Sequence, residues 1–231
     1  VTLPEGLEKI GSYSFNDSGL TDVTIPASVK EIEEYAFCHC ADLTAINVAE
    51  ANENYSSASG ILYNKDKTTV VYVPYKVDYS TFELPETVTT IGKGAFEGAT
   101  FEEFEIPETV TTIENAAFEG CANLKKVKIP ASVTEIADNA FVKCHDHFVI
   151  EAPEGSYAYS YALENGYILN GIMGDVTGDG KVTAIDARQT LQYAASNADF
   201  SPEQIKLADL NGDGTVTAFD ARLALQIAAN S

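Results

Sequence analysis

A short unit that repeats along most of the chain limits how this protein can fold. An apolar–x–apolar–Pro motif closes at Pro4, Pro26, Pro85, Pro107 and Pro130, at nearly equal intervals except for one long gap between Pro26 and Pro85. After each proline the pattern continues with an apolar residue, an isoleucine and, most often, an Ala-Phe pair. A single unit, about 23 residues long, cannot bury its own apolar face, so such units stack on one another into a solenoid.

A second motif predicts where the strands lie. A pattern of the form L-x-x-L-x-L begins at Leu20, Leu43 and Leu124. With the Ile-Pro and Ala-Phe-x-x-Cys motifs, it makes residues 1–170 resemble the BspA-like leucine-rich repeats of bacterial surface proteins. The resemblance implies a solenoid with a parallel β-sheet.

The long gap between Pro26 and Pro85 holds two β-rich runs around a polar turn at residues 64–67, which predicts an inserted β-hairpin. Such an insertion also resembles a regular feature of that family. Residues 162–169 are expected to form a C-terminal cap. Because residue 1 falls inside a strand pattern, we expect the natural chain to continue upstream.

A different repeat occupies the C-terminal part. Segments 175–186 and 209–220 share the spacing of an EF-hand loop, with oxygen ligands at positions 1, 3, 5, 7, 9 and 12 and glycine at position 6. The predicted ligands are Asp175, Thr177, Asp179, the Lys181 carbonyl, Thr183 and Asp186 in the first loop, and Asp209, Asn211, Asp213, the Thr215 carbonyl, Thr217 and Asp220 in the second. Hard oxygen ligands of this kind predict two calcium ions.

The last loop position, usually Glu, is Asp in both loops. Together with the pairing of the loops and the Gly-Asp-x-x-Gly-Asp-Gly-x-Val start, this makes residues 171–231 resemble a type I dockerin. Dockerins join proteins to the cohesin modules of scaffoldins in cellulosomes. Thr177 departs from the pattern, because Asn or Asp is expected there. The resemblance implies that loop positions 10 and 11 and the following helix contact the cohesin. Those residues are Ala184, Ile185, Arg188, Gln192, Ala218, Phe219, Arg222 and Gln226.

The alternative for Ile185 and Phe219 is that they pack in the core, as loop residues before a helix often do. We expect helices over 187–195 and 221–229 and a linker over 171–174. Ser201 followed by Pro202 predicts the start of a further helix between the loops.

Three of the four cysteines (Cys40, Cys121 and Cys144) occupy one repeat position, which favours stacked, buried, free thiols over disulfides. A disulfide between adjacent turns is the alternative, but Cys38 then lacks a partner. The segment 144–147, Cys-His-Asp-His, has metal-ligand types. We expect no metal there, because residue 147 replaces the leucine of the repeat and no second ligand cluster follows.

Composition excludes several classes of function. The net charge of −21 repels nucleic acids and anionic membranes, and no apolar run approaches the roughly 20 residues of a membrane span. Three histidines leave little for a Ser-His-Asp or Cys-His centre. The tyrosines between residues 55 and 79 could stack on sugars, but we expect them to pack within the insertion.

We therefore expect an α+β protein: a leucine-rich-repeat solenoid with one β-hairpin insertion over 1–170, and a small all-α dockerin with two calcium loops over 171–231. The predicted function is that of a non-catalytic, secreted cellulosome component. Its dockerin would bind a cohesin, and its solenoid would bind an unknown protein or glycan. The alternatives are an accessory region of a polysaccharide-degrading enzyme with its catalytic module upstream, or a direct cell-wall polysaccharide binder. The predicted recognition surface of the solenoid comprises Asp22, Thr24, Asn47, Glu103, Glu105, Lys126 and Lys128.

Overall fold

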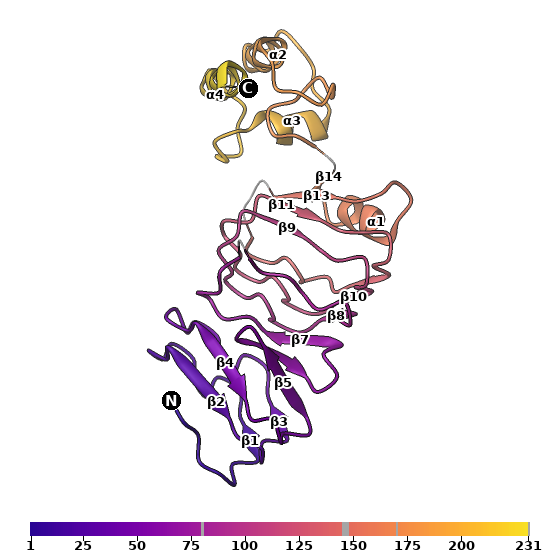
Figure 1. Cartoon of the computed structure of the whole chain (residues 1–231). Helices are drawn as coiled ribbons and strands as arrows, with labels where there is room; N and C mark the ends of the chain where they lie inside the picture. The colour runs from indigo at the N-terminus through magenta and orange to yellow at the C-terminus, as the bar shows by residue number, and fades with distance from the viewer. Residues whose placement is uncertain (80, 145–147, 170, 231) are drawn as a thin grey trace.

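The computed structural model describes residues 1–79, 81–144, 148–169 and 171–230. The chain forms an elongated molecule in which short strands and turns stack from the N-terminus toward a helical region at the other end (Figure 1). This confirms the predicted solenoid followed by a helical unit. Within the described residues, no helix is long and apolar enough to cross a membrane.

One side of the solenoid is built from the predicted L-x-x-L-x-L strands, which pair in parallel. β2 (Asp22–Ile25) pairs with β4 (Ala45–Val48); β9 (Glu103–Glu105), β11 (Lys126–Lys128), β13 (Val149–Glu151) and β14 (Ile168–Leu169) form a second sheet. Equivalent positions are in register, so Val127 lies between Phe104 and Ile150. Alternate side chains of each strand therefore face the core.

A second side carries shorter parallel strands, one from each turn. They are β1 (Lys9–Ile10), β3 (Glu31–Ile32), β8 (Thr90–Ile91), β10 (Thr112–Ile113) and β12 (Glu135–Ile136). The isoleucines of β8, β10 and β12 are paired with one another and buried, which explains why isoleucine recurs at this position.

The insertion is an antiparallel unit of three strands. β6 (Ile61–Asn64) and β7 (Thr69–Tyr72) form the predicted hairpin, and β7 also pairs in parallel with β8. The Asn64 side chain shapes the turn by accepting bonds from the amides of Thr68 and Thr69. The sequence did not predict the third strand, β5 (Tyr55–Ala58), which pairs with β6.

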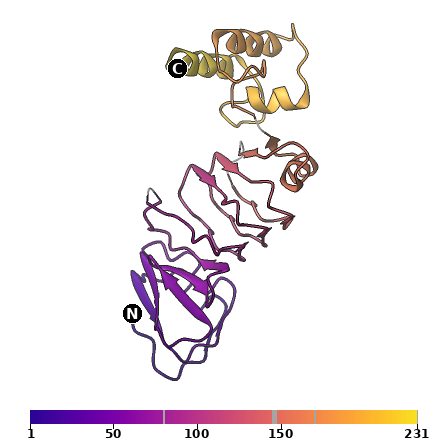
Figure 2. The same ribbon diagram turned by 45° about the vertical axis from the view of Figure 1, so that its right-hand side comes forward.

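The insertion divides the solenoid core into two hydrophobic clusters. Leu62 of β6 packs into the N-terminal cluster, whereas its neighbours Ile61 and Tyr63 pack into the central one. Figure 2 shows the inserted strands lying between the N-terminal and central turns. The two halves of the solenoid are therefore packed largely as separate blocks.

Aromatic rings stack along the axis within each block. Phe118 lies between Phe96 and Phe141, with ring centroids 5.1 Å apart on both sides. In the N-terminal block Phe15 stacks on Phe37 at 5.4 Å, and Tyr72 of the insertion follows at 5.9 Å. The phenylalanine of the Ala-Phe motif is thus the main core residue of each turn.

The cysteines are free, and three of them make the same contact. The thiols of Cys40, Cys121 and Cys144 each donate to the carbonyl oxygen of the Ala-Phe-type phenylalanine one turn earlier, at 2.9, 3.1 and 3.2 Å. They form the expected ladder of free thiols, in which Cys40 and Cys121 are buried and Cys144 is half-buried. Residues 145–147 of the Cys-His-Asp-His segment lie outside the described residues.

The solenoid ends in α1 (Tyr157–Glu164) and β14, in the segment expected to form a cap. Beyond it lie α2 (Ala184–Ala194), α3 (Pro202–Ala208) and α4 (Ala218–Asn230). Ser201 caps α3 with proline at its first turn, as predicted. The helices after the loops begin at residues 184 and 218, three residues earlier than expected, because threonine and aspartate side chains cap them.

The expected linker is packed against its neighbours. Leu207 of α3 and Val176 join Val149 and Ile168 of the last solenoid turn in one buried cluster. A side chain at Gly171 would collide with Leu207, so the backbone approaches α3 closely there. The helical region therefore rests on the end of the solenoid.

Candidate calcium-binding site

The first aspartate of each loop organises the turn that follows it. Asp175 is buried, and its Oδ1 accepts from the amide of Gly178 at 2.7 Å while its Oδ2 accepts from that of Gly180 at 2.8 Å. Gly180 has a φ of +85°, a conformation that other residues adopt only with strain. The glycine at position 6 thus lets the loop wrap around the carboxylate.

The last aspartate of the first loop closes it onto the helix. Asp186 is fully buried; its Oδ1 accepts from the Thr177 amide at 3.0 Å, and its Oδ2 accepts from the Thr183 amide and hydroxyl, both at 2.8 Å. The Thr183 hydroxyl oxygen in turn accepts from the Ile185 amide, and Thr183 and Asp186 form a capping box, in which the side chain of each accepts from the backbone amide of the other. One carboxylate therefore fixes both the loop and the start of α2.

The second loop repeats this arrangement. Asp209 accepts from the amides of Gly212 and Gly214 at 3.0 and 2.9 Å. Asp220 accepts from Leu210 and Asn211 with one oxygen and from Thr217 with the other. The first and last aspartates therefore make equivalent hydrogen bonds in the two loops.

Position 3 is where the loops differ. The Thr177 hydroxyl donates to Asp175 Oδ1 at 3.0 Å, whereas the Asn211 amide nitrogen donates to Asp213 Oδ2 at 2.8 Å. The carboxylates at position 5 accept from the amides two residues later, those of Lys181 and Thr215. Within the described chain, the carbonyl oxygens of those two residues accept no hydrogen bond, so both are available as ligands.

The charges in the loops suit a cation. Among the described residues, no lysine or arginine forms an ion pair with Asp175, Asp186 or Asp220. Burial pushes the pKa of Asp186 upward, but the bonds from Thr183 and Thr177 outweigh it and hold this pKa below its usual value. Buried, ionised carboxylates without a cationic side chain are what a metal ion would neutralise.

The donor set fits calcium, because every ligand is oxygen and carboxylates alternate with hydroxyl and carbonyl groups. In the described chain, one group of three His, Cys, Asp or Glu ligand atoms lies within 4.8 Å of one another, and it is outside both loops. The loop carboxylates are thus spread around each turn. A calcium ion when bound would supply the positive charge that draws them together.

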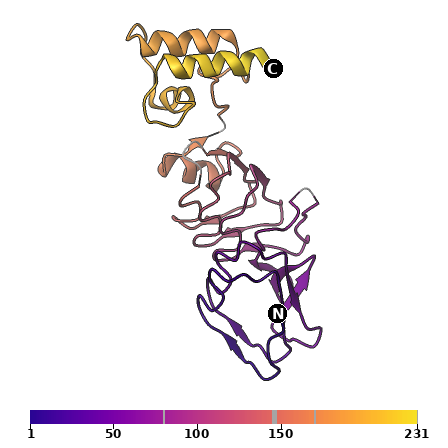
Figure 3. The same cartoon turned by 90° about the vertical axis from the view of Figure 1, so that its left-hand side faces the viewer.

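The residues predicted to contact a cohesin lie on the outer face of the helices. α2 and α4 lie side by side in Figure 3, with Ala187 and Ala224 buried where they meet. Ile185 is 51% exposed and Phe219 46%, so neither packs in the core. The remaining predicted contact residues, Ala184, Arg188, Gln192, Ala218, Arg222 and Gln226, are exposed as well.

Two further residues on this face did not stand out in the sequence. Leu191 and Leu225 occupy equivalent positions of α2 and α4, and both are about half exposed. The guanidinium of Arg222 lies 4.8 Å from the centre of the Phe219 ring. The spacing between the two leucines equals that between the loops, and this is the sequence feature that could have identified them.

The predicted recognition surface of the solenoid is divided in two. Asp22, Thr24 and Asn47 are exposed on β2 and β4, which form a sheet separate from β9 and β11. On the second sheet the charges pair across strands: Lys128 with Glu105 at 2.5 Å and Lys126 with Glu103 at 3.2 Å. Much of this charge is therefore already matched within the protein.

The tyrosines of the insertion are used in packing. Tyr63 and Tyr72 are buried, and Tyr55, Tyr75 and Tyr79 are half-buried. They do not form an exposed aromatic platform.

Comparison with known proteins agrees with the two-part architecture. A family model described as the BspA type leucine-rich repeat region matches residues 1–79 and 72–175 in six copies. The model of the dockerin type I domain matches residues 173–224. No curated protein matches this sequence.

Solved structures of leucine-rich repeat proteins are similar to this chain. One from Eubacterium ventriosum is 28% identical, with a TM-score of 0.59 over 66% of this chain and 41% of that chain. The pneumococcal vaccine antigen PcpA is 22% identical over 65% of this chain and 50% of its own, with a TM-score of 0.49. A leucine-rich cell surface protein from Faecalibacterium prausnitzii is 22% identical over 74% and 63%, with a TM-score of 0.43. The chain thus spans about two fifths of the first of these proteins.

Proposed function

Because this chain belongs to the BspA-type leucine-rich repeat family and carries a type I dockerin domain, we propose that it is a non-catalytic, secreted component of a cellulosome-type assembly. The observation that carries the proposal is the duplicated surface of the helical region. Each calcium loop leads directly into a helix that presents an apolar residue, an arginine and a leucine to solvent. The partner that a type I dockerin implies is a cohesin.

Calcium would act through the loops on this surface. Asp186 and Asp220 are both loop ligands and helix-capping residues, so an ion held by them fixes the first turns of α2 and α4. Ile185 and Phe219 lie in those turns. Binding of one ion in each loop, two in all, would therefore order the residues that meet the cohesin.

The chemistry of the surface suits a protein partner. Ile185, Phe219, Leu191 and Leu225 are large apolar side chains exposed by roughly half. Aromatic residues and arginine are enriched at the centres of protein interfaces, where removal of apolar area from water supplies the affinity. The Arg222 guanidinium over the Phe219 ring is preorganised for such a contact.

The test is a calorimetric titration of the full chain with a panel of recombinant type I cohesins, in excess calcium and in excess chelator. We expect at least one cohesin to bind in calcium and none to bind in chelator. Changing both Asp186 and Asp220 to Ala should abolish binding even in calcium. The matched control is Asp199→Ala, an exposed acid of the same region outside both loops, which should bind normally.

Two results would contradict the proposal: a panel in which no cohesin binds in calcium, or binding that persists in chelator.

The solenoid would serve protein recognition, which leucine-rich repeats imply. The competing role as a polysaccharide binder predicts that the chain is retained on insoluble cellulose or xylan. Because the tyrosines of the insertion are packed rather than exposed, we expect no retention.

A further inference from the structure

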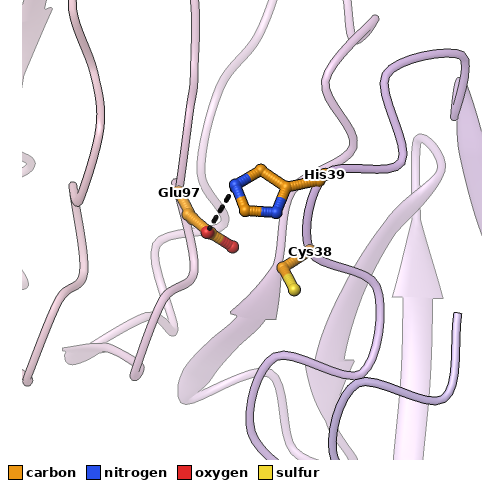
Figure 4. Close-up of side chains that lie close together, drawn as sticks. All are labelled: Cys38, His39 and Glu97. Carbon is orange, nitrogen blue, oxygen red and sulfur yellow. Dashed lines mark ion pairs between the residues drawn. The ribbon is translucent and has the colours of Figure 1, made fainter. Parts of the chain in front are cut away.

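A second cluster of metal-ligand types lies in the solenoid, far from the calcium loops. Cys38, His39 and Glu97 each offer a ligand atom, and the three atoms lie within 4.8 Å of one another. Figure 4 shows the side chains converging, with Cys38 and His39 on one loop and Glu97 on a neighbouring segment. None of these residues belongs to the site proposed above.

Stacking of the turns brings the cluster together. Phe15, Phe37 and Phe96 hold one repeat position in three turns, so the residues that follow them, Asn16, Cys38 and Glu97, also hold one position. Cys38 and Glu97 lie far apart in the sequence, on either side of the insertion. They meet because the inserted strands loop out of the repeat between them.

The distances within the cluster leave room for an ion. His39 Nε2 lies 3.6 Å from Glu97 Oε1, within the range of the ion pair drawn in Figure 4 but too long for a hydrogen bond. In a tetrahedral site with metal–nitrogen and metal–oxygen bonds of about 2.0–2.1 Å, neighbouring ligand atoms lie about 3.3–3.4 Å apart. The observed separation is therefore close to that of two ligands on one metal.

Glu97 supplies an independent sign of a missing ligand. The residue is 8% exposed, and its Oε2 has no hydrogen-bond partner among the described residues. Burial raises the pKa of this carboxyl above its usual value. A buried carboxylate oxygen without a partner is costly, and its position beside a thiol and an imidazole indicates what it would bind.

Asn16 positions the His39 ring and, before an ion binds, the Cys38 thiol. Its Oδ1 accepts from the Cys38 thiol at 2.8 Å and lies 3.1 Å from His39 Nδ1. Metal-binding histidines usually donate the second ring nitrogen to an oxygen of this kind, which fixes the tautomer. With the proton on Nδ1, the lone pair of Nε2 is free and faces Glu97.

We propose that Cys38, His39 and Glu97 form a zinc site that joins the two halves of the solenoid. A thiolate, an imidazole and a carboxylate are the ligand types of zinc and leave a fourth position for water. Calcium and magnesium prefer all-oxygen sites and are disfavoured by the sulfur and nitrogen ligands. His39 is exposed, so an ion can reach the site from solvent.

Binding must release a proton. Burial raises the pKa of the Cys38 thiol to about 11, so the thiol is protonated at neutral pH. When Zn²⁺ binds, the S–H bond breaks, sulfur keeps the electron pair as the Zn–S bond forms, and the proton passes to the buffer. Nothing is oxidised or reduced.

The location suggests what the ion does. Cys38 and His39 follow Phe37 of the N-terminal hydrophobic cluster, whereas Glu97 follows Phe96 of the central one. These blocks are separated by the insertion. An ion held from both sides would clamp them together and stabilise the folded state by mass action.

The test is a titration of the reduced full chain with Co²⁺ in excess calcium, so that the loops are already filled. We expect about one equivalent of Co²⁺ to give the thiolate charge-transfer band and the intense d–d bands of a tetrahedral ion, and Zn²⁺ to remove both. Cys38→Ser should abolish the charge-transfer band. The matched control is Cys40→Ser, a buried thiol two residues away, which should leave it intact.

Two further variants keep the test decisive if Cys38→Ser folds poorly. His39→Asn changes an exposed side chain at a φ of +56°, which Asn tolerates, and Glu97→Gln keeps the shape of the carboxylate. Each should weaken Co²⁺ binding by about tenfold or more. Absence of the band in the parent chain, its loss in Cys40→Ser, or unchanged affinity in both His39→Asn and Glu97→Gln would overturn the zinc site.

Discussion

The duplicated helical surface predicts that the dockerin binds its cohesin in two orientations. α2 and α4 present equivalent residues at the same spacing as the loops: Ile185 and Phe219, Arg188 and Arg222. If the two helix-loop units are related by a near two-fold axis, rotating the module by half a turn offers nearly the same chemistry. We expect either helix to serve as the principal contact.

The expected losses of affinity distinguish two binding modes from a single one. Changing Ile185 and Arg188 to Asp removes one mode, and losing one of two equal modes costs a factor of two, or about 0.4 kcal/mol. Fully burying one apolar side chain is worth about 1.5–3 kcal/mol. Removing the anchors of both modes should therefore weaken binding by a hundredfold or more.

The assay is calorimetry with a cohesin that binds the parent chain, in excess calcium. The variants are the Ile185/Arg188 pair, the Phe219/Arg222 pair and all four changes together. Asp at positions 185 and 219 lies in the first turn of its helix, where its charge complements the dipole, and positions 188 and 222 are exposed, so the variants should fold. If one pair alone abolishes binding and the other has no effect, the module has a single mode and the two-mode reasoning is wrong.

Three further predictions concern calcium and the core. Excess chelator should remove most of the helical circular-dichroism signal of residues 171–231, because six loop carboxylates then repel one another; full retention of that signal would contradict this. Thr177→Asn should raise calcium affinity in a calorimetric titration, since an amide carbonyl is a stronger ligand dipole than a hydroxyl; equal or lower affinity counts against it. Phe118→Ala, in the middle of the ring stack, should lower the free energy of unfolding by about 3–5 kcal/mol in denaturant melts, and Phe15→Ala, which is half-buried at the end of its stack, should cost clearly less.

Features encoded within one repeat could be predicted from the sequence. Most turns of the solenoid bury a phenylalanine and an isoleucine at the same repeat positions, so the motif alone predicted the turns and the L-x-x-L-x-L strands. The calcium loops are equally local, because all six ligands of each loop lie within one short segment of the chain. The start of α2 differs from the prediction, because Thr183 and Asp186 are not only predicted calcium ligands but also a capping box that begins the helix at residue 184.

Features that depend on the insertion could not be predicted in this way. β5 has no strong strand pattern and exists because β6 offers it an edge. Cys38 had no evident partner in the sequence, since Glu97 is its neighbour only after the inserted strands are looped out. Aligning the turns on Phe37 and Phe96 would have placed these two residues in register. A contact across an insertion can be predicted from the register of the repeats but not from the spacing of a short motif.

The packed junction between solenoid and helices gives a last prediction. The sequence predicts a linker at residues 171–174, and next to it Leu207 of α3 is buried with Val149 and Ile168 of the solenoid. Leu207→Ala should cost about 2–5 kcal/mol, because it leaves a cavity between the two regions. The strand β14 belongs to the solenoid, yet its stability should depend on this contact.

Hydrogen exchange in excess calcium can measure that dependence residue by residue. In Leu207→Ala, the amides of β14 should lose protection although no residue of the strand has changed, and chelation of the parent chain should have the same effect. The matched control is Leu225→Ala, a leucine that is 51% exposed on α4, which should leave β14 unaffected. If α3 loses protection in Leu207→Ala while β14 keeps it, the two regions fold independently and the shared cluster does not couple them. If β14 loses protection both in Leu207→Ala and in the chelated parent chain, calcium binding in the loops also stabilises the last turn of the solenoid.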